Sequence, residues 1–96
     1  MANYFVPFCG DRLATVSING HNLVIVSSRR DTFQHQLELM GADRVRVLRG
    51  GASPVEEQVF LNKIAADVGG GVVVAPSDIP LKDLLTNLER QLPWIH

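Results

Sequence analysis

The hydrophobic positions along this chain repeat with two periods, one typical of β-strands and the other typical of α-helices. Residues 13–18 alternate between apolar and polar side chains, and residues 23–26 are continuously apolar. Between these runs lies Asn19-Gly20, a pair that favours the type I′ turn of a two-residue hairpin because both residues tolerate a positive φ. We therefore predict an antiparallel hairpin whose second strand, 23–26, is covered on both faces.

Three segments carry apolar residues at helical spacing. The predicted helices cover residues 31–40, 53–68 and 81–92, and the strands between them cover residues 44–48 and 72–75. The second helix has the clearest start, because Ser53 can cap the amide of Glu56 while Pro54 occupies the first helical position. The helix faces that we expect in the core carry Phe33, Leu37, Met40, Val59, Phe60, Ile64, Val68, Leu81, Leu84, Leu85, Leu88 and Leu92.

This order of elements predicts an α/β fold. We expect one domain over residues 1–96, a small three-layer-like arrangement with an N-terminal β-hairpin followed by αβαβα and a mixed sheet with a parallel core. The apolar run from Tyr4 to Phe8 contains Pro7, which restricts it to an edge strand or an extended arm. The layout is similar to flavodoxin-like and other small three-layer α/β domains, and a likeness at this level implies no function.

Composition limits the partners that we expect. The 96 residues have a formal net charge of −1, so they exert no overall attraction on nucleic acid or on an anionic membrane. Five arginines lie between positions 29 and 49, and a solvated face explains such a group more often than a nucleic-acid surface does. Cys9 is the only cysteine and is expected to be a small buried side chain in a reducing compartment. Because the sequence has no signal-peptide pattern and no apolar run of bilayer length, we expect a cytoplasmic protein.

Three polar turns follow the predicted strands, and parallel strands would bring all three turns to one edge of the sheet. Ligands of α/β proteins usually bind at this carboxyl edge. Hydroxyl, guanidinium and free backbone N–H groups in these turns are suited to a small phosphate or carboxylate. The candidate ligand-binding residues are Ser27, Ser28, Arg29, Arg30, Arg49, Gly50, Ser53, Ser77 and Asp78. Each turn also has a simpler explanation as a helix start, and Glu56 and Glu57 oppose an anion beside Ser53.

No catalytic or cofactor signature accompanies these turns. The sequence contains neither the Gly-x-Gly-x-x-Gly turn of dinucleotide-binding folds nor the Gly-Lys-Ser/Thr of a phosphate-binding loop. Cys9 lacks the arginine of a Cys-x5-Arg phosphatase loop, since Thr15 occupies that position, and the three histidines show no metal-ligand spacing. We therefore predict no catalytic residue, no metal and no cofactor.

Two functions of different class remain. The first is a small non-catalytic protein-interaction or regulatory module that associates with a protein partner or with itself as a homodimer. It rests on an edge strand that must be protected and on apolar residues near the termini, namely Tyr4, Phe5, Phe8, Trp94 and Ile95. The alternative is a domain that binds a small phosphate-bearing ligand at the carboxyl edge of the sheet. The sequence favours the first, because it contains no acid–base or nucleophile arrangement.

Overall fold

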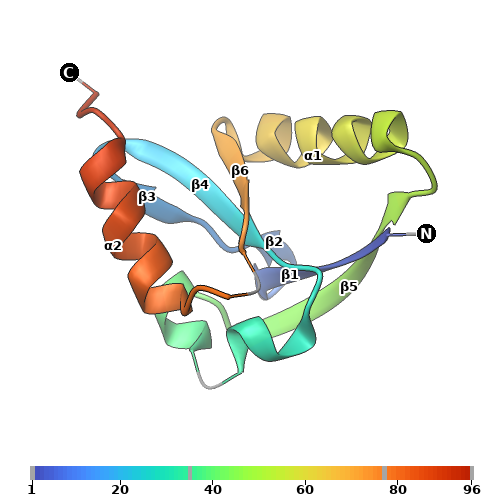
Figure 1. The fold of residues 1–96 in the computed structure, drawn as a ribbon, viewed down its shortest axis with the longest axis horizontal. Coiled ribbons are helices and arrows are strands. Elements are labelled where there is room, and N and C mark those ends of the chain that lie inside the picture. Colours follow the sequence, from blue (N-terminus) through green and yellow to red (C-terminus); the bar gives the residue numbers. More distant parts are fainter. Residues whose placement is uncertain (1, 35, 77, 96) are drawn as a thin grey trace.

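A computed structural model describes residues 2–34, 36–76 and 78–95 and shows a small α/β domain with two three-stranded sheets (Figure 1). The first sheet, in the order β2-β1-β5, contains β1 (Ala2–Cys9), β2 (Arg12–Leu13) and β5 (Arg44–Gly51), and both of its strand pairs are antiparallel. The second, in the order β3-β4-β6, contains the hairpin of β3 (Val16–Ile18) and β4 (His21–Val26), with β6 (Gly71–Val74) parallel to β4. The described helices are α1 (Pro54–Val68), α2 (Leu81–Gln91) and the short 3₁₀-helices η1 (Arg30–Phe33) and η2 (Leu37–Met40).

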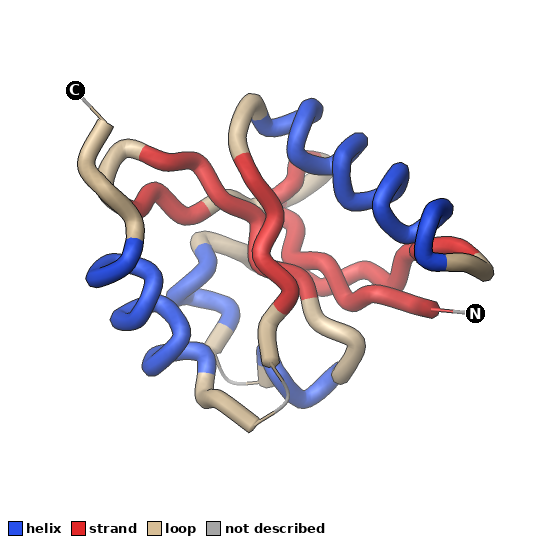
Figure 2. Tube along the Cα trace, turned by 45° about the horizontal axis from the view of Figure 1, so that its top comes forward, coloured by secondary structure: helices blue, strands red, loops and turns tan. Residues whose placement is uncertain are grey.

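The alternating side chains of β4 separate two hydrophobic cores. Val24 and Val26 have no exposed surface and pack in a cluster with Ile64 of α1. Ile25 is equally buried and belongs to the other cluster, which includes Leu84 of α2. The two helices therefore cover opposite faces of the β4–β6 pair, as the tube view shows (Figure 2). The prediction that strand 23–26 is covered on both faces is confirmed.

The two sheets are joined where β1 passes the end of β4. The Phe5 N–H donates a hydrogen bond to the Ser27 carbonyl at 2.6 Å, and the Ser27 N–H donates to the Phe5 carbonyl at 3.1 Å. Ser27 is buried, so this reciprocal pair satisfies backbone groups that water does not reach. The bonds hold β1 beside the end of β4 although the two strands belong to different sheets.

The predicted hairpin is confirmed, and its turn also holds the end of α2. Asn19 and Gly20 have φ values of 53° and 87°, as a type I′ turn requires. The Asn19 side-chain amide donates hydrogen bonds to the carbonyls of Glu89 and Leu92 at 2.8 and 2.7 Å. The Ile95 N–H donates to the Asn19 carbonyl at 3.0 Å. The turn therefore satisfies carbonyl groups at the C-terminal end of α2 that the helix leaves unpaired.

Residues 31–40 do not form the predicted α-helix. The chain makes η1 and η2 instead, with Gln34 in an extended conformation (φ −61°, ψ 126°) directly after η1. Thr32 and Phe33 have low helix propensity and no side chain caps η1, so a continuous helix has little local support. The break still places Phe33 and Met40 in one buried cluster, and Gly41 ends the segment with a φ of 63°.

The parallel core is smaller than predicted, because β5 pairs antiparallel with β1 and does not join β4. Among the described strands, β4 and β6 form the one parallel pair. The prediction of an edge strand or arm for Tyr4 to Phe8 is also wrong, since β1 lies between β2 and β5. Pro7 is tolerated there because β2 pairs with β1 only at Phe8 and Cys9, so no strand requires an N–H at Pro7.

The predicted start of α1 is confirmed. Ser53 Oγ accepts a hydrogen bond from the Glu56 N–H at 3.2 Å, as predicted. The Glu56 carboxylate in turn accepts a hydrogen bond from the Ala52 N–H at 2.6 Å. Gly51 makes this close approach possible, because a Cβ on Gly51 would lie 2.5 Å from the Glu56 Cβ, and its φ of 110° also favours glycine.

Two valines are exposed against expectation, Val59 on the predicted core face of its helix and Val74 in a run, 72–75, whose continuous apolar character predicts a buried strand. Val59 of α1 is 63% exposed, because the buried face of the helix passes through Phe60 and Ile64 instead. Val74 of β6 is 43% exposed, because β6 is the last strand of its sheet. Both differences depend on tertiary packing, which residue spacing does not determine.

The hydrogen bonds of Asn19 give a first prediction. Asn19→Gly keeps the positive φ but removes both bonds to α2, so we expect the free energy of unfolding to fall by about 2 kcal/mol. Asn19→Asp should destabilise more, since it places a carboxylate against two carbonyl oxygens. The exposed Asn22→Thr should change stability by less than about 0.5 kcal/mol in the same urea titration. Equal stability of the Gly variant and the wild type would show that the turn does not anchor α2.

A second prediction concerns Asp43, which precedes β5. The backbone N–H of Gly10 lies 3.3 Å from both carboxylate oxygens, and this contact, together with Arg44, holds the pKa of Asp43 below its ordinary value of 3.8. Because the folded-state pKa is lowered, the stabilisation is present above pH 3.8 and is lost as pH falls through the folded-state value. Asp43→Asn should therefore be less stable than the wild type near neutral pH, and urea titrations should show the difference narrowing in acid. A difference that is constant with pH would contradict this assignment.

Candidate functional site

Ser27 is buried, and its hydroxyl has two partners inside the protein. The Ser27 Oγ accepts a hydrogen bond from the Arg29 N–H at 3.0 Å and lies 2.7 Å from the hydroxyl of Thr32. Its backbone is bonded to Phe5. These contacts hold the chain as it leaves β4 and enters η1, so Ser27 positions its neighbours and offers little to a ligand.

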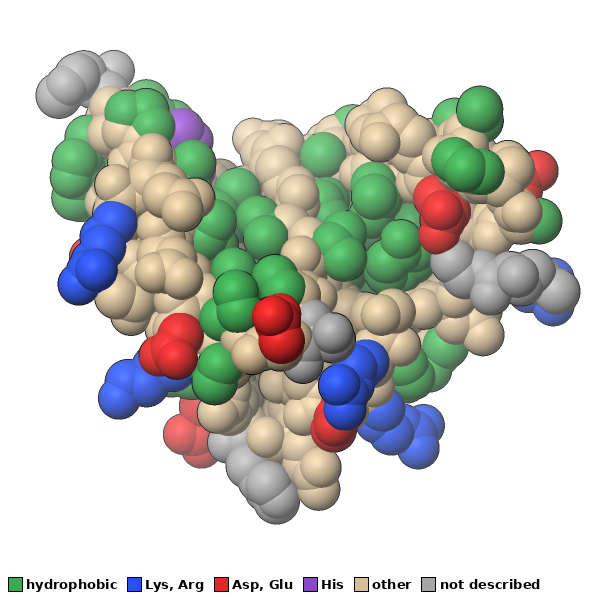
Figure 3. All heavy atoms as spheres, viewed as in Figure 1, with side chains coloured by type: hydrophobic (Ala, Val, Ile, Leu, Met, Phe, Trp, Pro, Cys, Tyr) green, Lys and Arg blue, Asp and Glu red, His purple; other side chains and the backbone are tan. Residues whose placement is uncertain are grey.

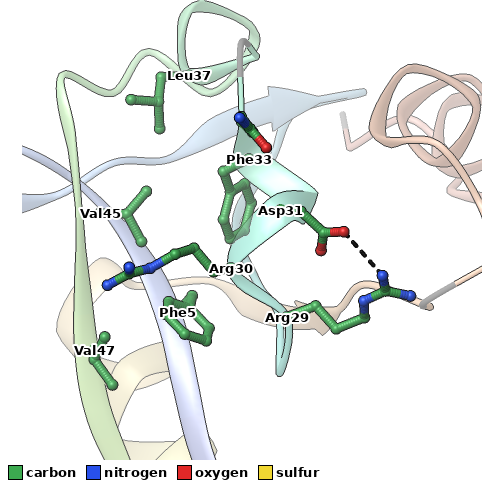
Figure 4. A pocket seen from close by; sticks show the side chains of 9 residues that line it. Phe5, Arg29, Arg30, Asp31, Phe33, Leu37, Val45 and Val47 are labelled. Atoms are coloured by element: carbon green, nitrogen blue, oxygen red, sulfur yellow. Dashed lines mark hydrogen bonds and ion pairs between the residues drawn. The ribbon is translucent and has the colours of Figure 1, made fainter.

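The three residues after Ser27 are exposed and point in different directions. Arg29 pairs with Asp31 at 2.9 Å, and both side chains are more than half exposed. Arg30 points the other way, from η1 toward β5, where its guanidinium lies 5.8 Å from the centre of the Phe5 ring (Figure 4). Ser28 is exposed, and no side chain caps η1. The two arginines therefore do not form a common anion site.

A polar hollow of about 280 Å³ lies between the segments that follow β4 and β6. Because these strands are parallel, their carboxyl ends are adjacent, as predicted. Arg29, Asp31 and Asp78 all line the hollow, and the start of α2 borders it at Leu81. The free N–H groups of a helix start attract anions. However, the carboxylates of Asp31 and Asp78 would repel an anion here, and the guanidinium group of Arg29 is already paired with Asp31. Ser77 lies outside the described residues.

The third turn does not join the other two. Gly51, at the end of β5, pairs with Ala2 of β1. Figure 1 shows this end of β5 near the N-terminus and away from α2. Arg49 is exposed, Gly50 is buried and Ser53 caps α1, so this turn is the structural helix start that was its simpler explanation. The expected convergence of three turns is wrong, because it required β5 to lie parallel within the sheet of β4.

A larger, mostly apolar groove of about 690 Å³ lies between η1, η2 and the first sheet. Phe5, Phe33, Leu37, Val45 and Val47 line it, together with Arg29, Arg30, Asp31 and Gln34. Figure 4 shows Arg30 extending across this groove from η1 toward the two valines of β5. The apolar walls can bind an apolar side chain, and the guanidinium group of Arg30 can bind a carboxylate next to it.

The sequence indicates only part of this groove. The alternation of Arg44 to Leu48 predicts a strand with its arginine face near solvent, and Arg44 and Arg46 are exposed, but Val47 on the opposite face is 49% exposed as well. The pairing of β5 with Phe5 of β1 could not be predicted, because the two residues lie far apart in the sequence and nothing in either strand specifies its partner. Arg30 was predicted as a ligand-binding residue, and it lies in the groove and not in the polar hollow.

The described residues show no arrangement for metal binding or nucleophilic catalysis. No group of three or more His, Cys, Asp or Glu side chains in the described segments could hold a metal ion. Cys9 is exposed and not buried as expected, because it ends β1 beside the turn to β2. His21 contacts the Pro93 carbonyl at 2.8 Å, and the other two histidines lie outside the described residues. None of the helices that the structure describes is long and apolar enough to cross a bilayer.

Tyr4 has a raised pKa, and its role is structural. Burial raises the pKa of its hydroxyl, and the negative charge and hydrogen bond of Glu57 raise it further. The hydroxyl donates to Glu57 at 3.3 Å, and the ring stacks on Phe60 at 5.6 Å between ring centres. Tyr4 therefore stays protonated and connects β1 to α1.

Comparisons of this chain with protein-family models, with curated proteins and with solved structures found no match. The proposals below therefore rest on the geometry alone.

The role of Ser27 gives a third prediction. Ser27→Ala removes the acceptor for the Arg29 N–H and leaves the Thr32 hydroxyl without this partner, so we expect a loss of about 1–2 kcal/mol in the free energy of unfolding. Ser28→Ala, at an exposed position, should change it by less than about 0.5 kcal/mol. Urea titration of both variants makes the comparison. If the two variants are equally stable, the Ser27 hydroxyl does not hold the turn.

Proposed function

We propose that this chain is a non-catalytic protein-interaction module that forms a homodimer through the free edge of β6. The observation that carries this proposal is that β6 ends its sheet with an unpaired and uncharged edge. Among the described residues β6 pairs only with β4, and its sequence is Gly-Val-Val-Val. Unprotected edges of this kind readily add another strand.

The register of β6 identifies the groups that are available for pairing. The Ala75 N–H donates to the Val26 carbonyl at 2.8 Å, so Ala75 faces β4. In a parallel pair, alternate residues direct both backbone groups to the same neighbour. Val73 therefore also faces β4, and Val72 and Val74 direct their N–H and C=O groups outward. A second strand could form hydrogen bonds with these two residues without disturbing the existing sheet.

Apolar side chains on both sides of β6 support an additional strand at this edge. Figure 3 shows hydrophobic surface on either side of the strand, between α2 on the left and α1 on the right. Each core includes hydrophobic side chains that are only partly buried. Those of α2 and its approach are Ile79, Leu85 and Leu88, and those of α1 are Phe60, Leu61 and Val68. Apolar surface of this kind is typical of a protein interface.

A second copy of the chain is the occupant that fits this edge best. Antiparallel pairing about a twofold axis at Val73 would place Val72 opposite Val74 of the second copy, and the reverse, with four backbone hydrogen bonds. No like charges would meet, because β6 has none. The resulting six-stranded sheet would have both α1 helices on one face and both α2 helices on the other. This arrangement would extend to the dimer the three-layer order that was predicted from the sequence.

The alternative function, binding of a small phosphate-bearing ligand, has less support. It would use the polar hollow at the ends of β4 and β6, where Arg29 is paired with Asp31 and Asp78 adds a second negative charge. Arg30 and Arg49, which would have contributed positive charge, lie outside that hollow.

Light scattering with size-exclusion chromatography tests the dimer and gives a fourth prediction. Over a concentration series the wild type should reach twice the chain mass of 10.6 kDa. Val74→Lys places a charge at the pairing edge and should raise the dissociation constant by at least about tenfold. Val74→Pro removes an outward N–H that β4 does not use, and it should act in the same direction.

Two controls separate pairing at β6 from other causes. Val74→Thr keeps shape and strand propensity without a charge and should remain dimeric. Arg46→Glu changes the exposed edge of the other sheet and should also remain dimeric. Thermal unfolding establishes that each variant is folded. A wild type that stays at the monomer mass, or a Val74→Lys variant that dimerises as well as the wild type, would refute the proposal.

A further inference from the structure

β5 is an end strand of the first sheet, and its outward backbone groups can be assigned. Phe5 directs its N–H and C=O to Ser27, and the Pro7 carbonyl accepts from the Ala14 N–H at 3.0 Å, so both residues face away from β5. In an antiparallel pair, if one residue points its N–H and C=O away from the partner strand, the residue directly opposite also points its N–H and C=O away from the first strand. Val47 is opposite Phe5 and Val45 is opposite Pro7. The N–H and C=O groups of Val45 and Val47 therefore point to the free edge.

The side chains of the same two valines line the apolar groove. Val47 is 49% exposed although it lies in the middle of a strand, and Phe5 and Phe33 form the neighbouring wall. In an antiparallel pair, directly opposite residues point to the same face of the sheet. Residues of an added strand that pair with Val45 and Val47 would therefore place their side chains over the groove.

The other face of β5 carries positive charge. Arg44 and Arg46 alternate with the two valines and pair with Asp43 and Asp11 at 3.0 and 3.5 Å. All four side chains are about half exposed or more, and exposed ion pairs of this kind contribute little, so either arginine can exchange its partner. Intervening residues of an added strand would face these two arginines. A carboxylate at such a position would be favoured, and a lysine or arginine would be repelled.

We propose that the β5 edge and the adjoining groove bind an extended segment of a protein partner in which apolar residues alternate with Asp or Glu. The segment adds to β5 as an antiparallel strand. Its apolar residues pair with Val45 and Val47 and contact Phe5 and Phe33, and its acidic residues face Arg44 and Arg46. Arg30, which crosses the groove and makes no ion pair with a described residue, offers another contact for a carboxylate (Figure 4). A second β5 does not fit this edge, because its arginines would repel those already there.

A fluorescently labelled, end-capped peptide of alternating Val and Glu residues tests this site. Fluorescence anisotropy should show saturable binding to the wild type, and Arg46→Glu should weaken it at least about tenfold. Arg90→Glu on α2 is a matched charge reversal at an exposed position and should bind as the wild type does. A peptide of alternating Val and Lys should reverse this preference, binding Arg44→Glu/Arg46→Glu and not the wild type. Circular dichroism establishes that each variant is folded.

Changes in the peptide separate strand addition from simple charge attraction and do not depend on any protein variant. A peptide of the same composition with its valines grouped together, and one with N-methylated valines, should each bind at least about tenfold more weakly. Amide hydrogen exchange should slow at Val45 and Val47 when the alternating peptide binds, with little change at Arg44 and Arg46, whose amides already face β1. Absence of saturable binding to the wild type, or equal binding of the grouped peptide, would overturn the proposal. Neither outcome of this experiment tests the β6 dimer, because β6 lies in the other sheet.

Discussion

The two hydrogen bonds between Phe5 and Ser27 join the two sheets and determine which backbone groups β5 exposes. A line across this bridge passes β5, β1, the end of β4 and β6, while β2 and β3 are the other end strands of the two sheets. Because Phe5 directs its backbone groups to Ser27, the opposite residue Val47 must direct its own groups outward. Ser27 directly follows β4, which pairs with β6 on its other side. This contact therefore accounts for the backbone groups that β5 exposes, and the Ala75–Val26 hydrogen bond accounts for those of β6.

The two ends differ in chemistry, and this difference has a physical consequence. β5 has arginines on one face. Charged side chains on an edge strand commonly prevent it from pairing with the same strand of another copy. β6 presents valines without any charge. A chain that paired through both β5 and β6 could add copies without limit, whereas pairing through β6 alone closes into a symmetric pair. The arginines of β5 thus favour a limited assembly and, at the same time, select what else can bind there.

The features that the sequence predicted are those determined by neighbouring residues. The Asn19-Gly20 turn and the Ser53 cap depend on a few adjacent positions, and both form in the structure. The pairing of β1 with β5 depends on contacts between distant residues, and it overrode the expected parallel core. The residues of the candidate site do not come together for the same reason. Arg49 and Gly50 lie in the last part of β5, away from Ser27. The groove was missed because Phe5, Phe33 and Val47 come from three separate segments.

The two proposed surfaces have a simple geometric relation. If two copies pair through β6, the charged β5 edges are not part of the pairing, because β5 ends the other sheet of each copy. Neither edge is then covered by the partner, and the dimer offers two equivalent sites. A partner that carries two acidic and apolar segments, joined by a linker long enough to span the dimer, would bind far more tightly than a partner with one, because its second binding step is intramolecular. Dimerisation would in this way give the β5 site an affinity that one short strand does not provide by itself.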